Sequence, residues 1–251
     1  MSPNPQPPAD PTPPDFPMSL RNFILGLAAS FGAAWLAVVV VPFFKMRSLE
    51  PLPLAEPVGT STVFHPKRTG RIANGADVYA ANGCALCHTQ VVRPTYAGND
   101  LYRADWGGLK DDADRGDTRR ETNAYDFEGE TFAQIGSTRL GPDLSNLGRR
   151  VEAAHASFAE ATRWLYLHLY DPKLDSTRWD SQCPPHRFLF EERDVRGQPS
   201  PDALPVAASE GKQVVPAADA RALISYLLSL RKDHPLPAAL DFAPAKPAAA
   251  E

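Results

Sequence analysis

The sequence has little of what marks most common functional classes. Only three of its 251 residues are cysteine and three are methionine, and three cysteines are too few for a disulfide-stabilised scaffold. Lysine and arginine together number 26 against 30 acidic residues, so no basic excess points to nucleic acid as a partner. There is no internal repeat, no glycine-rich phosphate loop and no nucleophile elbow. What the sequence does contain is one long apolar run, 26 prolines and a close pair of cysteines.

Composition divides the chain into five parts. Residues 1–19 are polar and rich in proline, which predicts a disordered tail. Residues 20–45 hold the apolar run, and residues 46–70 predict an extended linker. The remaining parts are a folded domain with long loops over residues 71–232 and a second tail, rich in proline and alanine, over residues 233–251.

The apolar run predicts a transmembrane anchor. No charged residue lies between Arg21 and Lys45, and at about 1.5 Å per residue the run is long enough to cross a hydrocarbon core of about 30 Å. A cleaved signal peptide is the alternative, but the run is too long and no small-residue cleavage site follows Phe44. The flanking charges, Arg21 on one side and Lys45 and Arg47 on the other, leave the orientation open.

Helical periodicity in the folded part predicts a mainly α fold. Residues 159–172 form an amphipathic pattern that ends in an Asp-Pro pair, and a helix from about residue 71 precedes the close cysteines. Residues 217–232 form a last helix that buries four side chains, Leu223, Ile224, Leu227 and Leu230. Residues 97–130 are rich in glycine and aspartate and predict a long surface loop, and residues 191–215 form a second long segment without a predicted element.

The sequence Cys-Ala-Leu-Cys-His, from Cys84 to Cys87 and His88, is the attachment pattern of a c-type haem. Two thiols one helical turn apart can form thioethers to the vinyl groups on one edge of a porphyrin, and His88 then supplies the proximal nitrogen. A thioredoxin-like pair would need a βαβ context that is missing. A zinc site with Cys183 and His186 as the second ligand pair stays open. The pattern predicts one covalent haem c. Such attachment takes place outside the bacterial cytoplasmic membrane, which would put the folded part in the periplasm.

Sequence blocks beyond the haem motif resemble one family. They are "CALCHTQVVRP" at residues 84–94, "ETNAYDF" at 121–127, "IGSTRLGPDLSNLGRR" at 135–150 and "HLYDP" at 168–172. In this order, and with an anchor helix before them, they resemble the membrane-anchored mono-haem c subunit (subunit II) of cbb3-type haem–copper oxidases. The resemblance covers most of residues 20–190 and is far more specific than the haem motif by itself.

The resemblance implies a c-type cytochrome domain behind one transmembrane helix, in the bacterial cytoplasmic membrane. Such a chain passes electrons to the haem–copper catalytic subunit, beside other cytochrome subunits, and is not catalytic by itself. The resemblance also implies that Gly141 and Pro142 form a loop against the proximal histidine, with the Pro142 carbonyl orienting His88. Three other functions remain open: a stand-alone anchored electron carrier, the cytochrome subunit of a nitric oxide reductase, and small-ligand chemistry at a five-coordinate haem.

The sixth iron ligand is unusual, because no methionine lies within the folded part. The methionines are Met1, Met18 and Met46. The family places a methionine-proline pair where this sequence has Cys183-Pro184, so Cys183 as thiolate is one candidate and His186 is the other. The third possibility is an inert Cys183 with a five-coordinate iron or one capped by His168 or His155. His168 lies on the apolar face of its helix, where a hydrogen-bonded core histidine is expected. A thiolate or a second imidazole lowers the haem potential relative to methionine.

Overall fold

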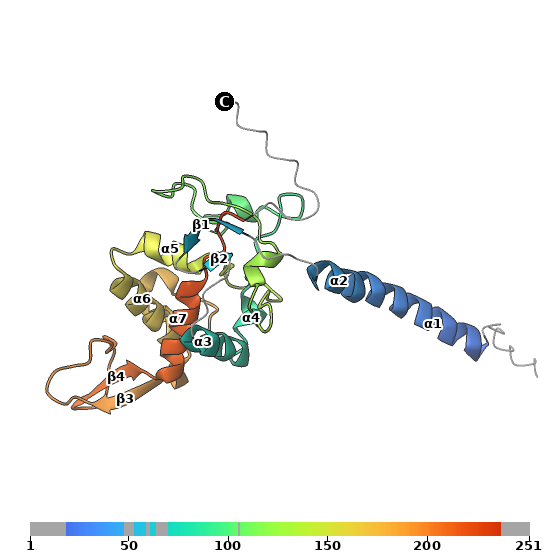
Figure 1. The fold of residues 1–251 in the computed structure, drawn as a ribbon. Helices are drawn as coiled ribbons and strands as arrows, with labels where there is room; N and C mark the ends of the chain where they lie inside the picture. Colours follow the sequence, from blue (N-terminus) through green and yellow to red (C-terminus); the bar gives the residue numbers. More distant parts are fainter. Residues whose placement is uncertain (1–18, 48–52, 59–60, 64–69, 105, 237–251) are drawn as a thin grey trace, which may run out of the picture. The chain divides into compact units, whose positions relative to one another are not determined.

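The structure is a computed structural model that describes residues 19–47, 53–58, 61–63, 70–104 and 106–236. The chain divides into two compact units, Met1–Phe64 and His65–Glu251, and each is described by itself (Figure 1). The predictions of a proline-rich tail up to residue 18 and of a second tail beyond residue 236 lie outside the described residues.

The first unit contains the expected apolar helix. Three segments run on as one helical stretch of 28 residues: α1 Leu20–Trp35, the π-helical turn η1 Leu36–Val40 and α2 Val41–Arg47. The Ser19 side chain begins the helix by accepting a hydrogen bond from the backbone N–H of Asn22, as an N-cap serine does. No residue of the stretch is buried. An exposed apolar helix of this length can cross a membrane, as predicted from the sequence.

A short hairpin occupies part of the segment predicted as an extended linker. Strands β1 Pro53–Val58 and β2 Ser61–Val63 pair antiparallel, with Val58 opposite Ser61. The backbone is extended here, as expected, but its hydrogen bonds are partly satisfied within the segment.

The second unit is built around the crossing of α3 Gly70–Ala81 and α7 Ala218–Ser229, which Figure 1 shows in contact. At the crossing the two backbones touch, since a Cβ at Gly75 would lie 2.1 Å from the carbonyl oxygen of Ala222. Next to it the rings of Tyr79 and Tyr226 pack with their centroids 5.4 Å apart. The four side chains predicted to be buried by the last helix are buried, which confirms the apolar face of that helix.

Two further helices, α5 Leu147–Ala154 and α6 Phe158–Tyr170, complete this core. The α6 helix begins at Ser157, whose side chain accepts a hydrogen bond from the N–H of Glu160, and it ends before Asp171-Pro172 as predicted. Short 3₁₀ turns follow α6 in the sequence: η4 Pro172–Leu174, η5 Ser176–Arg178 and η6 Arg187–Leu189.

The predicted surface loop over residues 97–130 is only partly on the surface. It contains the 3₁₀ turns η2 Asp100–Tyr102 and η3 Ala124–Phe127, and it buries four side chains, those of Asp100, Trp106, Tyr125 and Asp126. The expectation of a solvated loop fails because arginines neutralise these aspartates: Arg93 and Arg139 pair with Asp100, and Arg120 of the loop itself pairs with Asp126. The carboxylates can therefore leave water.

The segment from 191 to 215 is also more ordered than expected. Strands β3 Phe190–Asp194 and β4 Lys212–Pro216 form an antiparallel hairpin with Phe190 opposite Pro216. Beyond α7 the buried Asp233 accepts hydrogen bonds from Arg115 and Thr118 at 2.8 and 2.9 Å. The folded part therefore extends past residue 232, where the sequence predicted a tail.

Candidate functional site

The cysteine pair lies on one short helical turn, α4 Cys84–Cys87. Gly83 precedes it in the left-handed conformation, at φ 68°, which glycine adopts without strain. The turn ends at His88, whose backbone is extended. The Cys84, Cys87 and Cys183 thiols are free and half-buried. This local geometry presents two thiols one turn apart and places a histidine directly after them.

The His88 imidazole is held by a backbone carbonyl. Its Nδ1 lies 2.8 Å from the carbonyl oxygen of Pro142. Burial lowers the pKa of His88 more than the contact with Pro142 raises it, so the ring is neutral at pH 7. In the tautomer that donates from Nδ1 to Pro142, the opposite nitrogen Nε2 keeps its lone pair, as a metal-ligating histidine requires.

Two glycines let the loop after Ile135 lie directly against the motif. A Cβ at Gly141 would lie 2.2 Å from Cε1 of His88, and a Cβ at Gly136 would lie 2.1 Å from the backbone oxygen of His88. The Gly141 N–H also donates a hydrogen bond to the carbonyl of Cys87 at 2.9 Å. No side chain fits between this loop and the histidine.

Further backbone hydrogen bonds tie the same loop to the motif at both ends. Ser137 N–H donates to Ala85, Gln90 N–H donates to Ile135, and Leu144 N–H donates to Thr89, each at 2.8 Å. The position of the imidazole is therefore determined by two segments about fifty residues apart in the chain, as the separations of these contacts show.

A buried polar network, which the sequence analysis did not predict, connects this loop to the segment that follows His88. Asp143 accepts from the Thr89 hydroxyl at 2.6 Å and from the backbone N–H of Val91 at 3.0 Å. Arg139 donates to the Thr89 hydroxyl at 2.9 Å and pairs with Asp100 at 2.7 and 2.8 Å. Arg139 and Asp143 stand in the block that resembles the oxidase family, but nothing in the sequence pairs Arg139 with Asp100.

Asp100 is the centre of this network. Its side chain is fully buried, and Arg93 also pairs with it at 2.9 Å. Although burial by itself would raise the pKa of Asp100, the hydrogen bonds from Arg139 and Arg93 hold it well below its usual value. The carboxylate is ionised at all working pH values, and it joins the segments after His88 and before Gly141.

Cys183 lies within electrostatic range of the cysteine pair. Burial first, and then the neighbouring Cys183, raise the pKa of Cys84 to about 11. Burial, and then Cys87, raise the pKa of Cys183 as well. The structure thus brings Cys183 near the cysteine pair, from which it is separated by about a hundred residues in the sequence.

His186 and His168 also approach this region. The backbone N–H of His186 donates to the carbonyl of Leu169 at 2.8 Å, which ties its loop to α6. Burial first, and then the neighbouring Arg178 and His88, lower the pKa of His168 to about 4. His155 instead lies beside Glu160, with Nδ1 3.9 Å from the carboxylate.

His168 differs from expectation. Its ring stacks on Trp164 with centroids 5.3 Å apart, but its buried Nδ1 has no hydrogen-bond partner in the described part of the chain, and neither has the Nδ1 of His186. A hydrogen-bonded core histidine was expected at position 168. Buried nitrogens without partners are rare in folded proteins, and here two of them lie near the cysteine motif.

These residues fit a haem. Within 70–104 and 106–236, no three histidine, cysteine or acidic side chains are placed to hold a metal ion by themselves, which does not favour the zinc alternative. A haem of this type needs two thiols, one oriented imidazole and an apolar surrounding. The first two are present. Large exposed apolar side chains, which a flat apolar group would cover, stand in the motif and in the loop that lies against it: Leu86, Ile135 and Leu140.

A small helical domain that contains this motif and follows one apolar helix in the sequence is a c-type cytochrome. Comparison with protein families narrows the class: the family model described as "Cytochrome C oxidase, mono-heme subunit/FixO" matches residues 34–207. The chain belongs to that family, and the resemblance drawn from the sequence blocks is confirmed. Membership implies one haem c and a place in a cytochrome oxidase complex. A search of curated proteins found no match.

Proposed function

We propose that this chain is the membrane-anchored cytochrome that passes electrons through one covalent haem c to the catalytic subunit of a haem–copper oxidase. The observation that carries the proposal is His88 held at Nδ1 by Pro142 in a chain of the mono-haem oxidase subunit family. When bound, the haem supplies reversible one-electron chemistry.

The chain's own residues hold that group in place. Cys84 and Cys87 attach it through thioethers, and His88 offers Nε2 to the iron. Pro142 fixes the ring and its tautomer, and Gly141 lets the Pro142 carbonyl come close enough to do so. Because the ring cannot rotate without breaking this contact, His88 would keep the same orientation toward the group whichever oxidation state the group has.

For the sixth ligand we favour Cys183 over His186. Cys183-Pro184 stands where the resemblance places methionine-proline, and Cys183 is a neighbour of both motif thiols, whereas His186 is a neighbour of His168. A thiolate ligand stabilises ferric iron and lowers the potential below that of a methionine-ligated haem. His186, with its unpartnered Nδ1, is the second candidate.

Three variants test this choice: Cys183→Ala, His186→Ala and Cys183→Met, each in the full chain with haem bound. Electron paramagnetic resonance of the oxidised protein distinguishes thiolate from imidazole ligation. We expect Cys183→Ala to remove the thiolate signature, His186→Ala to leave it, and Cys183→Met to raise the midpoint potential. An unchanged spectrum in Cys183→Ala would exclude Cys183 as a ligand.

The anchor keeps the cytochrome in the same membrane as its partner. Their encounter then depends on a high effective concentration and not on free diffusion. Thioether attachment outside the cytoplasmic membrane would put the second unit in the periplasm and residues before Leu20 in the cytoplasm. A C-terminal tag that is accessible to protease in intact spheroplasts would support this orientation, and a protected tag would contradict it.

Purification from gently solubilised membranes tests the partner. Recovery of a large subunit with b-type and high-spin haem, together with oxygen uptake, supports the oxidase role. Nitric oxide reduction by the recovered complex would favour a nitric oxide reductase instead. A single c-haem chain in several detergents would indicate a stand-alone carrier, and carbon monoxide binding to it would indicate a five-coordinate haem.

A further inference from the structure

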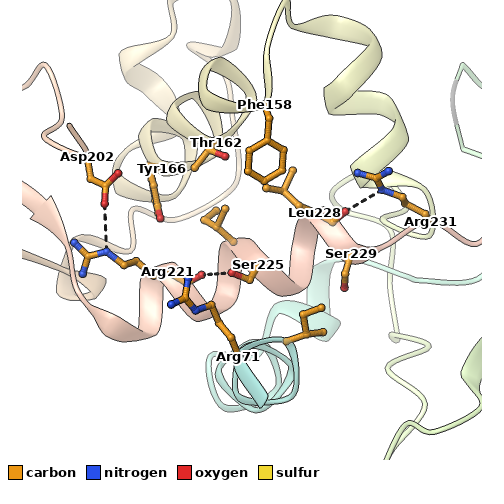
Figure 2. A pocket seen from close by; sticks show the side chains of 12 residues that line it. Arg71, Phe158, Thr162, Tyr166, Asp202, Arg221, Ser225, Leu228, Ser229 and Arg231 are labelled. Atoms are coloured by element: carbon orange, nitrogen blue, oxygen red, sulfur yellow. Dashed lines mark hydrogen bonds and ion pairs between the residues drawn. The ribbon is translucent and has the colours of Figure 1, made fainter. Parts of the chain in front are cut away.

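A concave site that no residue of the cysteine motif lines lies beside α3 and α7. It is a pocket of about 520 Å³ whose floor is α7 and whose walls are the first turn of α3 and one side of α6 (Figure 2). That volume lies within the range of about 300–1,000 Å³ usual for small-molecule sites. Nothing in the proposed electron transfer uses this pocket.

Its lining combines positive charge with an apolar floor. Three arginines and one aspartate line it, Arg71, Arg221, Arg231 and Asp202. Because Arg231 also pairs with Glu152, one formal positive charge remains, in a chain whose net charge is −4. The apolar lining residues are Ile72, Phe158, Ile224 and Leu228. A purely polar anion would leave this apolar surface in contact with water, and a purely apolar ligand would leave the charge of Arg71 without a partner.

The positive charge is concentrated at one end. Figure 2 shows Arg71 and Arg221 reaching toward the same end of the pocket, and both act electrostatically on Tyr166. Asp202 neutralises this end only in part: it is well exposed and meets one nitrogen of Arg221 at 3.4 Å. Exposed ion pairs of this kind contribute little free energy to stability. Arg71 makes no ion pair or hydrogen bond within the described segments.

Three further observations favour an anion as the ligand of this pocket. Arg71 stands in the first turn of α3, which contains no acidic residue, so its charge opposes the helix dipole instead of complementing it. The buried Oγ1 of Thr162 has no hydrogen-bond partner in the described part of the chain. The Tyr166 hydroxyl remains protonated at neutral pH, since burial raises its pKa, and is available as a donor.

We propose that this pocket binds an amphipathic carboxylate, with its anionic group between Arg71 and Arg221 and its apolar body over Ile224 and Leu228. The guanidinium groups and the two hydroxyls supply charge-assisted hydrogen bonds to the carboxylate. The floor formed by α7 removes a short hydrocarbon chain from water. The ligand is held by α3, α6 and α7 together and so stabilises their packing.

The test uses the full chain with haem bound, in nanodiscs, and hexanoate as the probe. Saturation-transfer NMR measures binding of hexanoate, acetate, inorganic phosphate and hexanol, with empty nanodiscs as the background. We expect hexanoate to bind at least about tenfold more tightly than acetate, because the burial of only two of its four additional methylenes gives this factor. Phosphate should bind no better than acetate, and hexanol should not compete with hexanoate. Equal affinities for hexanoate and acetate would overturn the proposal.

Variants locate the site. Arg71→Gln loses no ion pair and should weaken hexanoate binding by roughly tenfold, the effect of one charge-assisted hydrogen bond. Arg163→Gln is the matched control, on the exposed side of α6, and should bind as the parent does. Equal binding by these two variants would place the probe elsewhere and refute the proposal.

Thr162 provides an independent second test. Thr162→Val keeps the side-chain shape and removes the unpartnered hydroxyl, so thermal stability should not fall while hexanoate binding weakens. Thr162→Ser should keep the binding. If Thr162→Val binds hexanoate as tightly as the parent, the carboxylate does not reach α6. Haem spectrum and potential should stay constant in all these variants, so failure here is distinct from failure of the proposed electron transfer.

Discussion

Gly141→Ala is the most direct perturbation of the arrangement around His88. The added Cβ would lie 2.2 Å from Cε1 of the imidazole, whereas ordinary contact begins at 3.4 Å. The ring or the loop must therefore retreat by about 1.2 Å. The Gly141 N–H is bonded to the Cys87 carbonyl, so the loop cannot yield easily and the ring moves away from Pro142.

The magnitude follows from two contributions. Overpacking in a closely packed site costs about 1–3 kcal/mol, and loss of the bond between His88 and Pro142 costs about 1 kcal/mol. We expect the free energy of unfolding to fall by about 2–4 kcal/mol. The haem spectrum should also change, because the ligand nitrogen moves with the ring.

Urea unfolding of the full chain in detergent, followed by tryptophan fluorescence and haem absorption, measures both effects. Gly70→Ala is the control, because a Cβ at Gly70 meets nothing within 4 Å. A Gly141→Ala protein that unfolds within about 1 kcal/mol of the control, with an unchanged spectrum, would refute the claim that this loop positions His88.

Three further predictions concern the fold around the site. Gly75→Ala places a Cβ 2.1 Å from the Ala222 carbonyl, and since two backbones meet there we expect a loss of at least about 2 kcal/mol in urea unfolding; a smaller loss would mean that the helices can separate without penalty. Asp100→Asn leaves Arg139 without its anion in a buried site, so the free energy of unfolding should fall by about 3 kcal/mol in the same assay. An unchanged free energy of unfolding would contradict the stabilising role of the network. The pKa of His168 is about 4 when folded and 6.5 in the unfolded reference, so the unfolded chain binds the extra proton between these values. Stability should be full above pH 6.5 and fall as the pH drops toward 4, and His168→Gln should remove that part of the slope in unfolding curves at pH 7, 6 and 5.

Local patterns were enough to predict the helical elements and the cofactor motif. The apolar run required a helix that could cross a membrane, and the Asp-Pro pair ended α6 where expected, because backbone sterics before proline act within a few residues. The order of the sequence blocks identified the family, and the pattern of Cys84, Cys87 and His88 predicted a haem. The prediction that residues 97–130 form a surface loop was partly wrong, because a surface loop and a buried turn held by salt bridges have the same charge-rich composition.

The sequence by itself determined what depends on neighbours along the chain: the anchor helix, the turn that spaces Cys84 from Cys87, and the histidine directly after it. The tertiary structure alone decided which distant residues meet. It gathered Arg139 and Arg93 around Asp100 and placed arginines around the apolar floor that α7 forms. The contact of Pro142 with Nδ1 of His88 was expected from the resemblance, but its geometry came from the structure. These contacts follow from how helices cross and loops return, and long-range packing of this kind leaves no periodic signal in a single sequence.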